Sequence, residues 1–504
     1  MRVEQFLRDS AQCFPEKTAL VAGGRRLSYA ELDAMSDRMA AALACRGLAR
    51  GDRAIVFMDN CWEAVVSIFA VQKAGGVFSP INPSTKAEKL AYVINNSGAV
   101  AILTQDHLIS VVDTALKDCP SVKFSIVAGR DFDAAIASDA PLPGMPGIDI
   151  DLSMLVYTSG STGFPKGVMM THQNVTAAAT SITSYLENTP SDIILNVLPI
   201  SFDYGLYQVL MTMKAGATLI LEKSFAFPQA IFTRLKEEQA TGFPLVPTMA
   251  ALILQMKDIK PGAFPHLRYL TNTAAALPPA HIMRLQELFP TTRIYSMYGL
   301  TECKRCTYLP PTELANRPSS VGIAIPGTEA YVVDDNNNHV KCGETGELVI
   351  RGAHVMKGYW ENPEATDKVL RPGPFPWEKV LHTGDLFRTD QEGFLYFVGR
   401  KDDIIKTRGE KVSPKEIENV LYALPGIREA AVVGAPDPIL GHAIKAVVAL
   451  APGSDLTEQN IIRHCAKHLE DFMVPKIVEF RDELPKTESG KISRRKVCVM
   501  QAAE

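Results

Sequence analysis

Residues 157–168 form a short segment, YTSGSTGFPKGV, that combines glycine, hydroxyl side chains and a lysine. It follows an apolar run, Met154–Tyr157, that is typical of a buried strand. Glycine lets backbone N–H groups approach anionic oxygens, and hydroxyl and ammonium groups add donors and charge, so this loop can enclose a polyphosphate. It is not a Walker A loop, because Gly160, Gly163 and Lys166 do not fit G-x-x-x-x-G-K-[ST]. A plain Ser/Gly surface loop is the alternative, but it does not explain the tyrosine before the loop or the Pro-Lys-Gly that ends it.

Strand and helix signals alternate over the first part of the chain. Ser28 and Glu31 have the spacing of a capping box at a helix start, and Gly47 can end that helix. The next predicted elements are strands at Ala54–Met58, Val77–Pro80 and Val100–Leu103 and a helix at Trp62–Lys73. Such alternation predicts βαβ units around a parallel sheet. Residues 129–150, rich in Gly, Pro, Asp and Ala, predict a surface connection.

The chain changes character after this α/β region. From residue 321 to 398, short strands separated by Gly, Asn and Asp turns predict a smaller β-rich lobe. Its predicted strands are Tyr331–Asp334, Glu347–Arg351 and Phe394–Val398. A separate α/β unit follows, with helices at Lys415–Leu424 and Glu458–His468 and strands at Ala430–Gly434 and Ala446–Leu450. The polar run Gly399–Asp403 lies between the two bodies and is either a hinge or an ordinary turn.

The composition is that of a soluble globular protein. The 504 residues are 46% hydrophobic and 21% charged, and the net charge of -4 argues against a nucleic-acid surface. We expect no membrane span, because no uninterrupted apolar stretch reaches about 18 residues. Nine scattered cysteines predict reduced thiols in a cytoplasmic protein. Cys303 and Cys306 form one C-x-x-C, and His464 and His468 are spaced i, i+4, but both lack the partners that a zinc or redox motif requires.

Four further motifs follow the loop in order: YGLTE (298–302), TGD (383–385), GRKDD (399–403) and PKTESGK (485–491). Together the five motifs resemble the signature of the adenylate-forming superfamily, which includes acyl-CoA synthetases, peptide-synthetase adenylation domains and beetle luciferases. The resemblance covers nearly the whole chain. It implies an α/β fold with a large N-terminal domain of βα layers and a small β-rich lobe over residues 1–400. A hinge at Asp402 would join it to a small mobile α+β C-terminal domain over residues 401–504.

The resemblance also implies an ATP site. The residues expected to bind the nucleotide are Thr158, Ser159, Gly160, Ser161, Thr162, Gly163, Lys166, Ala275, Tyr298, Gly299, Asp385 and Arg400. The loop residues would hold the β- and γ-phosphates, and Tyr298 would lie against the adenine. Asp385 would accept hydrogen bonds from the ribose, with Arg400 beside it, or else be a plain turn residue. Around Ala275, alanines replace the glycines usual in the family.

Three residues are the expected catalytic groups. Activation of a carboxylate by ATP brings two anions together, so the site must neutralise charge. By resemblance, Lys491 would reach both the carboxylate and the α-phosphate, and Thr301 would contact the α-phosphate. Glu302 would bind Mg²⁺, a hard cation that prefers oxygen ligands, unless it is only a carboxylate at a helix start. The alternative for Lys491 is a solvated lysine in a charged tail.

The same lysine must leave before a thiol can attack. The family rotates its C-terminal domain for this step. Residues 406–414 would then face the active site, with Gly409 near the incoming coenzyme A. Their G-E-K-x-x-P pattern resembles acyl-CoA ligases, although Arg408 stands where a glycine is common. The plain alternative is a strand-to-helix turn in which Ser413-Pro414 starts the helix.

The acid is expected to bind in a pocket that the resemblance also outlines. Its expected residues are Asp203, Tyr204, Tyr207, Thr271, Thr273, Met297, Arg305 and Cys306. The run Ser201-Phe202-Asp203 resembles amino-acid-activating domains, in which the aspartate pairs with an α-ammonium group. Asp203 could equally cap the following helix. Arg305 would receive a polar or anionic substrate end or pair with an acidic neighbour.

The predicted function is therefore ATP- and Mg²⁺-dependent, AMP-forming activation of a small-molecule carboxylic acid, followed by thioester formation with coenzyme A. The alternative is a stand-alone adenylation enzyme that loads an amino or fatty acid onto the phosphopantetheine of a carrier protein. A non-catalytic nucleotide sensor would need to have lost Lys491 or Glu302, and both are present.

Overall fold

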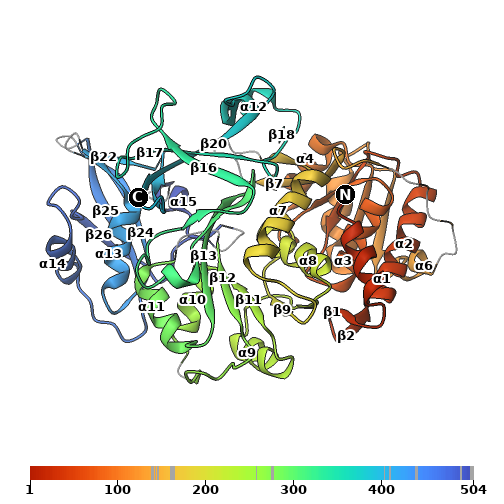
Figure 1. Cartoon of the computed structure of the whole chain (residues 1–504), viewed down its shortest axis with the longest axis horizontal. Helices are drawn as coiled ribbons and strands as arrows, with labels where there is room; N and C mark the ends of the chain where they lie inside the picture. Colours follow the sequence, from red (N-terminus) through yellow and green to blue (C-terminus); the bar gives the residue numbers. More distant parts are fainter. Residues whose placement is uncertain are drawn as a thin grey trace.

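The computed structural model describes residues 1–137, 141, 144, 147–158, 165–256, 258–273, 277–401, 403–407, 410–437, 441–487 and 491–499. The described residues form two large sheets, a small β-rich lobe and a C-terminal α+β unit. Figure 1 shows these parts in sequence colours.

The first sheet has seven strands in the order β18-β8-β7-β4-β3-β5-β6. Its strands are β3 (Arg53–Phe57), β4 (Val77–Pro80), β5 (Ala101–Gln105), β6 (Phe124–Ala128), β7 (Leu152–Thr158), β8 (Lys166–Thr171) and β18 (Gly358–Tyr359). β7, β4, β3, β5 and β6 pair in parallel, as the alternation of strands and helices predicts. β7 and β8 form an antiparallel pair, and residues 159–164 connect them.

The second sheet has nine strands in the order β15-β14-β13-β12-β11-β9-β10-β1-β2. Its strands are β1 (Thr18–Ala22), β2 (Arg25–Ser28), β9 (Ile193–Asn196), β10 (Thr218–Leu221), β11 (Gly242–Leu245), β12 (Tyr269–Asn272), β13 (Arg293–Leu300), β14 (Lys304–Tyr308) and β15 (Ile323–Ala324). The six strands from β13 to β1 pair in parallel. The carboxyl ends of β9, β12 and β13 therefore meet at one edge, where α/β proteins bind ligands.

Helices fill the space between the sheets and cover their outer faces. They are α1 (Gln5–Cys13), α2 (Tyr29–Cys45), α3 (Trp62–Lys73), α4 (Ala87–Ser97), α5 (Ile109–Leu116), α6 (Phe132–Ile136), α7 (His172–Tyr185), α8 (Asp203–Ala215), α9 (Pro228–Glu237), α10 (Pro247–Ile253) and α11 (Pro279–Leu288), with 3₁₀ turns at Asp106–Leu108 and Pro311–Glu313. α3 contacts β3 and β4 of the first sheet and β1 of the second, and α7 contacts β7, β8 and β14. One continuous hydrophobic core, which includes Phe69, Val156, Ile182 and Leu219, thus joins both sheets.

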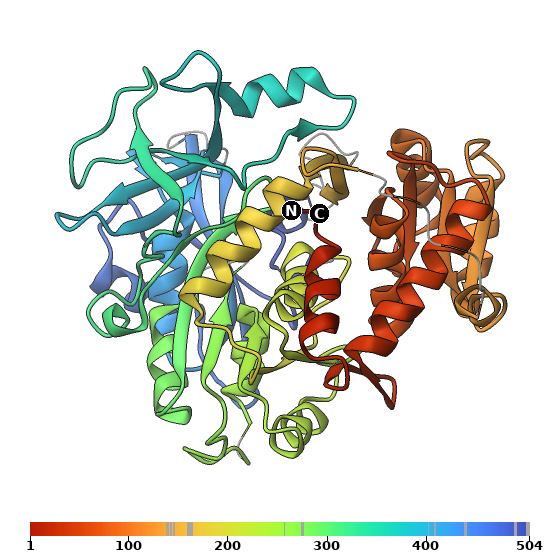
Figure 2. The same cartoon turned by 45° about the vertical axis from the view of Figure 1, so that its right-hand side comes forward.

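The β-rich lobe follows the second sheet. Its elements are β16 (Thr328–Val333), β17 (Gly346–Gly352), α12 (Pro363–Val369), β19 (Leu370–Pro372), β20 (Lys379–Thr389) and β21 (Leu395–Arg400). All of its strand pairs are antiparallel. Figures 1 and 2 show this lobe in teal on the side of the second sheet.

The C-terminal unit has its own core. Its elements are β22 (Ile405–Thr407), β23 (Glu410–Val412), α13 (Pro414–Ala423), β24 (Ile427–Asp437), β25 (Gly441–Leu450), α14 (Glu458–His468), β26 (Ile477–Phe480) and α15 (Arg494–Val499). Ile417, Leu421, Val432, Val448 and Ile461 are buried together in a cluster that draws only on this part of the chain. α13 contacts α11 and β21, so the unit lies against the second sheet and the lobe.

The predicted fold class is confirmed. The capping box is formed as predicted, because the Ser28 hydroxyl accepts a hydrogen bond from the Glu31 backbone N–H and the Glu31 carboxylate accepts one from the Ser28 backbone N–H. One local prediction was wrong: the stretch 129–150 is not only a surface connection, since it contains α6 with Phe132 and Ile136 buried. Its pattern was hidden because a helix of five residues is too short to show a clear period.

Candidate active site

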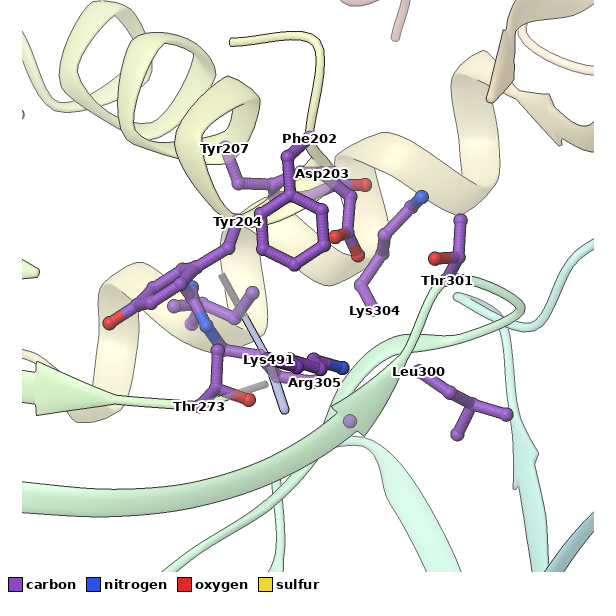
Figure 3. Close-up of a pocket in the computed structure, with 12 residues that line it drawn as sticks. Phe202, Asp203, Tyr204, Tyr207, Thr273, Leu300, Thr301, Lys304, Arg305 and Lys491 are labelled. Atoms are coloured by element: carbon purple, nitrogen blue, oxygen red, sulfur yellow. The ribbon is translucent and has the colours of Figure 1, made fainter. Parts of the chain in front are cut away.

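A cavity lies where the chain leaves β9, β12 and β13 (Figure 3). The residues that line it are Ile182, Phe202, Asp203, Tyr204, Tyr207, Thr273, Gly299, Leu300, Thr301, Lys304, Arg305 and Lys491. Its volume is about 40 Å³. The lining residues include one from the C-terminal unit, Lys491, so the two parts of the chain form the cavity together.

Most of the predicted acid-binding residues line this cavity, and three lie behind it. Thr271 accepts a hydrogen bond from the Tyr204 hydroxyl through its carbonyl at 2.8 Å, and Met297 Sδ accepts one from Tyr185 at 2.9 Å. Cys306 is fully buried and is not among the lining residues. Thr271 and Met297 therefore orient tyrosines rather than face the cavity.

Asp203 is the first residue of α8, and Phe202 occupies the N-cap position. The interpretation of Asp203 as the N-cap was therefore wrong by one residue. As an acidic group in the first turn it still interacts favourably with the helix dipole. Its side chain lines the cavity, where Figure 3 shows it between Phe202 and Lys304.

The turn from β13 into β14 and the strand ends beside it contribute five of the lining residues: Gly299, Leu300, Thr301, Lys304 and Arg305. A Cβ on Gly299 would lie 1.8 Å from the carbonyl oxygen of Lys304, so only glycine fits this crossing. Lys304 has φ of +64°, a conformation that non-glycine residues rarely adopt. This turn directs Thr301, Lys304 and Arg305 to the same cavity.

Lys304 is a lining residue that the sequence reasoning missed. It is 3% exposed, and burial lowers its pKa below the usual range, while Asp203 and Glu302 act in the opposite direction. Its position beside Arg305 was the available signal, because two adjacent basic residues after a predicted magnesium ligand are unusual for a buried strand.

Glu302 is held by a residue of β18, the edge strand of the first sheet. The Tyr359 hydroxyl donates to Glu302 Oε1 at 2.6 Å, and the Met356 N–H donates to the Glu302 carbonyl at 2.8 Å. Lys166 Nζ lies 5.2 Å from the centre of the Tyr359 ring. Tyr359 thus joins the predicted phosphate-loop lysine to the predicted magnesium ligand, and no motif in the sequence indicated it.

Asp385 is buried and forms a polar group with Tyr298 and with Arg400, whose side chain is largely exposed. The Tyr298 hydroxyl donates to Asp385 Oδ2 at 2.6 Å, and Arg400 Nε lies 3.2 Å from Oδ1. Burial raises the pKa of Asp385, while Arg400 and the Tyr298 hydrogen bond act against this rise. The Tyr298 ring packs edge-on against Phe387, with centroids 4.9 Å apart.

Lys491 enters the cavity from the C-terminal unit. Its backbone N–H donates to Thr487 Oγ1 at 3.2 Å, which fixes the base of the side chain. Burial lowers the pKa of Lys491, and the carboxylates of Asp203, Asp385 and Glu302 oppose this effect. The acidic residues of the larger part of the chain therefore favour the charged form of this lysine.

Several predicted residues lie outside the described part of the chain. They are Ser159, Gly160, Ser161, Thr162, Gly163, Ala275, Asp402 and Gly409. The two ends of the predicted phosphate loop are described: Thr158 ends β7, Lys166 begins β8, and the two residues are paired in register.

The cysteine and histidine pairs have ordinary surroundings. Cys303 and Cys306 are free buried thiols with their sulfurs 3.4 Å apart. His464 shares a hydrogen bond with the Val420 carbonyl at 3.1 Å. Across the described ranges, no three His, Cys, Asp or Glu residues cluster as metal ligands. Within the same ranges, no helix has both the length and the apolar character to cross a membrane.

Comparisons with known proteins agree with this geometry. The family model described as AMP-binding enzyme matches residues 7–360, and the model of the AMP-binding enzyme C-terminal domain matches residues 416–491. The chain is 32% identical to a long-chain-fatty-acid–CoA ligase of Bacillus subtilis, over 98% of this chain and 94% of that protein.

Solved structures are also similar over the full length. ATP-bound MatB from Rhodopseudomonas palustris superposes with a TM-score of 0.89 at 29% identity, over 99% of both chains. The anthranilate CoA ligase AuaEII in complex with anthranoyl-AMP gives a TM-score of 0.93 at 26% identity, over 100% of this chain and 98% of that chain. The chain belongs to the AMP-binding enzyme family. Its class within that family is the AMP-forming acid–thiol ligases of the acyl-CoA synthetase type.

Proposed function

We propose that the protein activates a carboxylic acid with ATP to an acyl-adenylate and then transfers the acyl group to coenzyme A. The observation that carries the proposal is the position of Lys491. This lysine belongs to the C-terminal unit, yet it lines one cavity with Thr301 and Asp203 of the larger part. A cation at this junction can lower the repulsion between the carboxylate and the α-phosphate as negative charge builds up.

In the first step, the carboxylate oxygen attacks the α-phosphorus and diphosphate leaves. Lys491 would bind the attacking carboxylate and an α-phosphate oxygen. The Thr301 hydroxyl would donate to the same phosphate. Lys166, at the end of the loop after β7, would bind the departing diphosphate, with the hydroxyl and glycine residues of that loop around it.

Glu302 is the residue that would hold Mg²⁺. The donor chemistry fits, since a carboxylate is a preferred ligand of this hard cation, and Tyr359 orients the group through one carboxylate oxygen. A bound divalent cation supplies charge neutralisation of the phosphates.

The buried group around Asp385 would hold the nucleoside. Its carboxylate, oriented by Tyr298 and Arg400, can accept hydrogen bonds from two ribose hydroxyls. Hydrogen bonds from the ribose would replace the hydrogen bonds to water that Asp385 lost on burial. The Tyr298 ring would lie against the adenine.

In the second step, a thiolate attacks the acyl carbon and AMP leaves. The C-terminal domain, residues 401–504, would rotate about Asp402 to withdraw Lys491 and bring residues 406–414 to the cavity. The names of the B. subtilis and AuaEII relatives support coenzyme A as the acceptor. The free cysteines support a reducing compartment such as the cytoplasm.

The acceptor can be tested directly. The purified protein should form a thioester with free coenzyme A and not with a panel of holo carrier proteins. Faster loading of a carrier protein would instead favour the stand-alone adenylation enzyme, for which the cavity position of Asp203 is the supporting observation.

The first prediction tests Lys491. We expect Lys491→Ala to lower acid-dependent ATP–pyrophosphate exchange by about 100- to 1,000-fold, because the transition state loses its bridging cation. The matched control is Lys486→Ala in the same motif, whose ammonium forms an ion pair with Glu429 at 2.8 Å. The control should keep exchange within about threefold of the original protein. Near-normal exchange by Lys491→Ala would refute the proposed role.

A further inference from the structure

Two cations of the acid cavity have buried nitrogens without an acceptor. Arg305 and Lys304 are each 3% exposed. Among the described residues, Arg305 Nη2, Lys304 Nζ and the Tyr207 hydroxyl have no hydrogen-bond partner. All three residues line the same cavity (Figure 3).

The contacts that these cations do make are weak. The Arg305 guanidinium lies 4.9 Å from the centre of the Tyr204 ring, and its Nη1 is 3.5 Å from Met211 Sδ. Lys304 Nζ lies 5.6 Å from the centre of the Tyr207 ring. Aromatic faces attract cations, but they do not replace the hydrogen bonds that water gives to a guanidinium or ammonium group.

Backbone strain at Lys304 adds a second energetic cost beside the unpaired nitrogens. Lys304 has φ of +64°, so a strained residue places two basic side chains beside one another. Unpaired buried charge and strained backbone together are a signature of a site that is completed by a ligand. A purely structural pair of residues would be expected to have acceptors of its own.

The charge balance of the cavity indicates the sign of that ligand. Its lining residues include three cations, Lys304, Arg305 and Lys491, against one carboxylate, Asp203. In the proposed reaction Lys491 binds the carboxylate that is activated. Asp203 and Glu302 both act on the Lys304 ammonium, whereas Arg305 has no carboxylate partner among the described residues and stays protonated at any physiological pH. One positive charge is therefore left for the distal part of the acid.

We propose that the acid is a short dicarboxylic acid whose second carboxylate binds Arg305, with Lys304 and the Tyr207 hydroxyl as further donors. This inference rests on the proposed function and specifies its substrate class. A guanidinium and a carboxylate match in geometry through two parallel hydrogen bonds. The cavity is small, about 40 Å³, which favours a short chain over a long one. A long alkyl chain would leave both cations desolvated and unpaired.

The first test compares matched acids on the unmodified protein. Pyrophosphate exchange is measured with straight-chain dicarboxylates of three to six carbons, each against its own monoamide and the monocarboxylic acid of equal length. We expect the best dicarboxylate to exceed its monoamide by about 10- to 100-fold in kcat/KM, the effect of a buried charge-assisted hydrogen bond.

The second test changes the arginine. Arg305→Met should remove most of this preference, lowering kcat/KM for the dicarboxylate about 10- to 100-fold more than that for its monoamide. The matched control is Arg293→Met at the exposed start of β13, where the arginine forms an ion pair with Glu187 at 2.6 Å. The control should keep the preference.

A binding measurement separates this inference from the proposed function. The dicarboxylate alone should raise the melting temperature of the unmodified protein and not that of Arg305→Met. Equal or better activation of the neutral acids would overturn the dicarboxylate proposal while leaving adenylation intact. If no acid supports exchange, adenylation itself fails, and the melting shift then decides whether the anionic site exists. Absence of a shift would overturn it.

Discussion

At Gly299 the backbone of β13 passes so close to Lys304 that no side chain fits between them. A Cβ there would lie 1.8 Å from the Lys304 carbonyl oxygen and 2.8 Å from the Arg305 Cα. The motif glycine is therefore required by the turn itself, whether or not it also contacts the nucleotide. The same turn determines where Thr301, Lys304 and Arg305 point.

We predict that Gly299→Ala forces β14 away from β13. The expected result is a loss of about 1–3 kcal/mol in the free energy of unfolding, the usual cost of overpacking. Adenylation should fall as well, because the basic residues move with the strand. Urea unfolding and pyrophosphate exchange measure the two effects. Gly144→Ala is the control, since a Cβ there meets no atom within 4 Å. Unchanged stability of Gly299→Ala would contradict this account.

At the scale of elements, the contact between α11 and α13 joins the larger part of the chain to the C-terminal unit. His281 of α11 packs edge-on against Tyr422 of α13, with ring centroids 5.5 Å apart. Burial lowers the pKa of His281 to about 4, and Arg284 and Lys415 act in the same direction. The folded protein therefore keeps this ring neutral at a pH where the unfolded chain protonates it.

The pH dependence of stability follows from this difference. With an unfolded pKa near 6.5, the unfolded state gains a proton between about pH 6.5 and 4 that the folded state does not, so stability is complete above this window and is lost as the pH falls. The contribution of His281 between pH 7.5 and 5 is about 2 kcal/mol. We predict that His281→Phe, which keeps an aromatic contact but cannot titrate, loses less stability over this interval.

Urea unfolding at pH 7.5 and pH 5 measures the effect. For each protein, the slope is the change in the free energy of unfolding between these two pH values. His281→Phe and the unmodified protein share all other titrating groups, so the difference between their slopes gives the contribution of the His281 ring. His266→Gln, at an exposed histidine, is the control substitution. Equal slopes for His281→Phe and the unmodified protein would show that the ring is not kept neutral.

At the scale of the whole molecule, the proposed function assigns the position of Lys491 in the cavity to the adenylation step. The C-terminal unit has its own core and is fixed to the linker by Arg494, which pairs with Glu418 at 2.7 Å and Asp403 at 3.1 Å. A unit with an independent core can move as a body once its contact with α11 opens.

We predict that Asp402→Pro separates the two half-reactions. Proline fixes φ near -65°, so a backbone rotation at this residue would be blocked. Pyrophosphate exchange should stay within about threefold, while coenzyme A thioester formation should fall by about 100-fold or more. Asp402→Ala, which loses the side chain and keeps the rotation, should support both steps. Equal loss of both activities in the proline variant would argue against a hinge at this residue.

Local chemistry decided which parts of the molecule could be predicted. Some features depend on residues only three or four positions apart, and such a pattern can be recognised in the sequence. They include the capping box of Ser28 and Glu31 and the helices α3 and α14. The family resemblance likewise placed Thr301 and Lys491 at the catalytic centre and Asp203 and Arg305 in the acid pocket, and all four line one cavity.

The sequence by itself therefore determined the fold class, the family and the residue types available for catalysis. Only the tertiary structure decided which of these residues meet. Tyr359 reaches Glu302 from 57 positions away, and Tyr298 reaches Asp385 from 87 positions away. It also decided that Thr271 and Met297 lie behind the cavity, and that Arg305 Nη2 and Lys304 Nζ are buried with no hydrogen-bond partner among the described residues. The physical reason is that desolvation and hydrogen bonding depend on packing between distant segments, which a linear pattern does not contain.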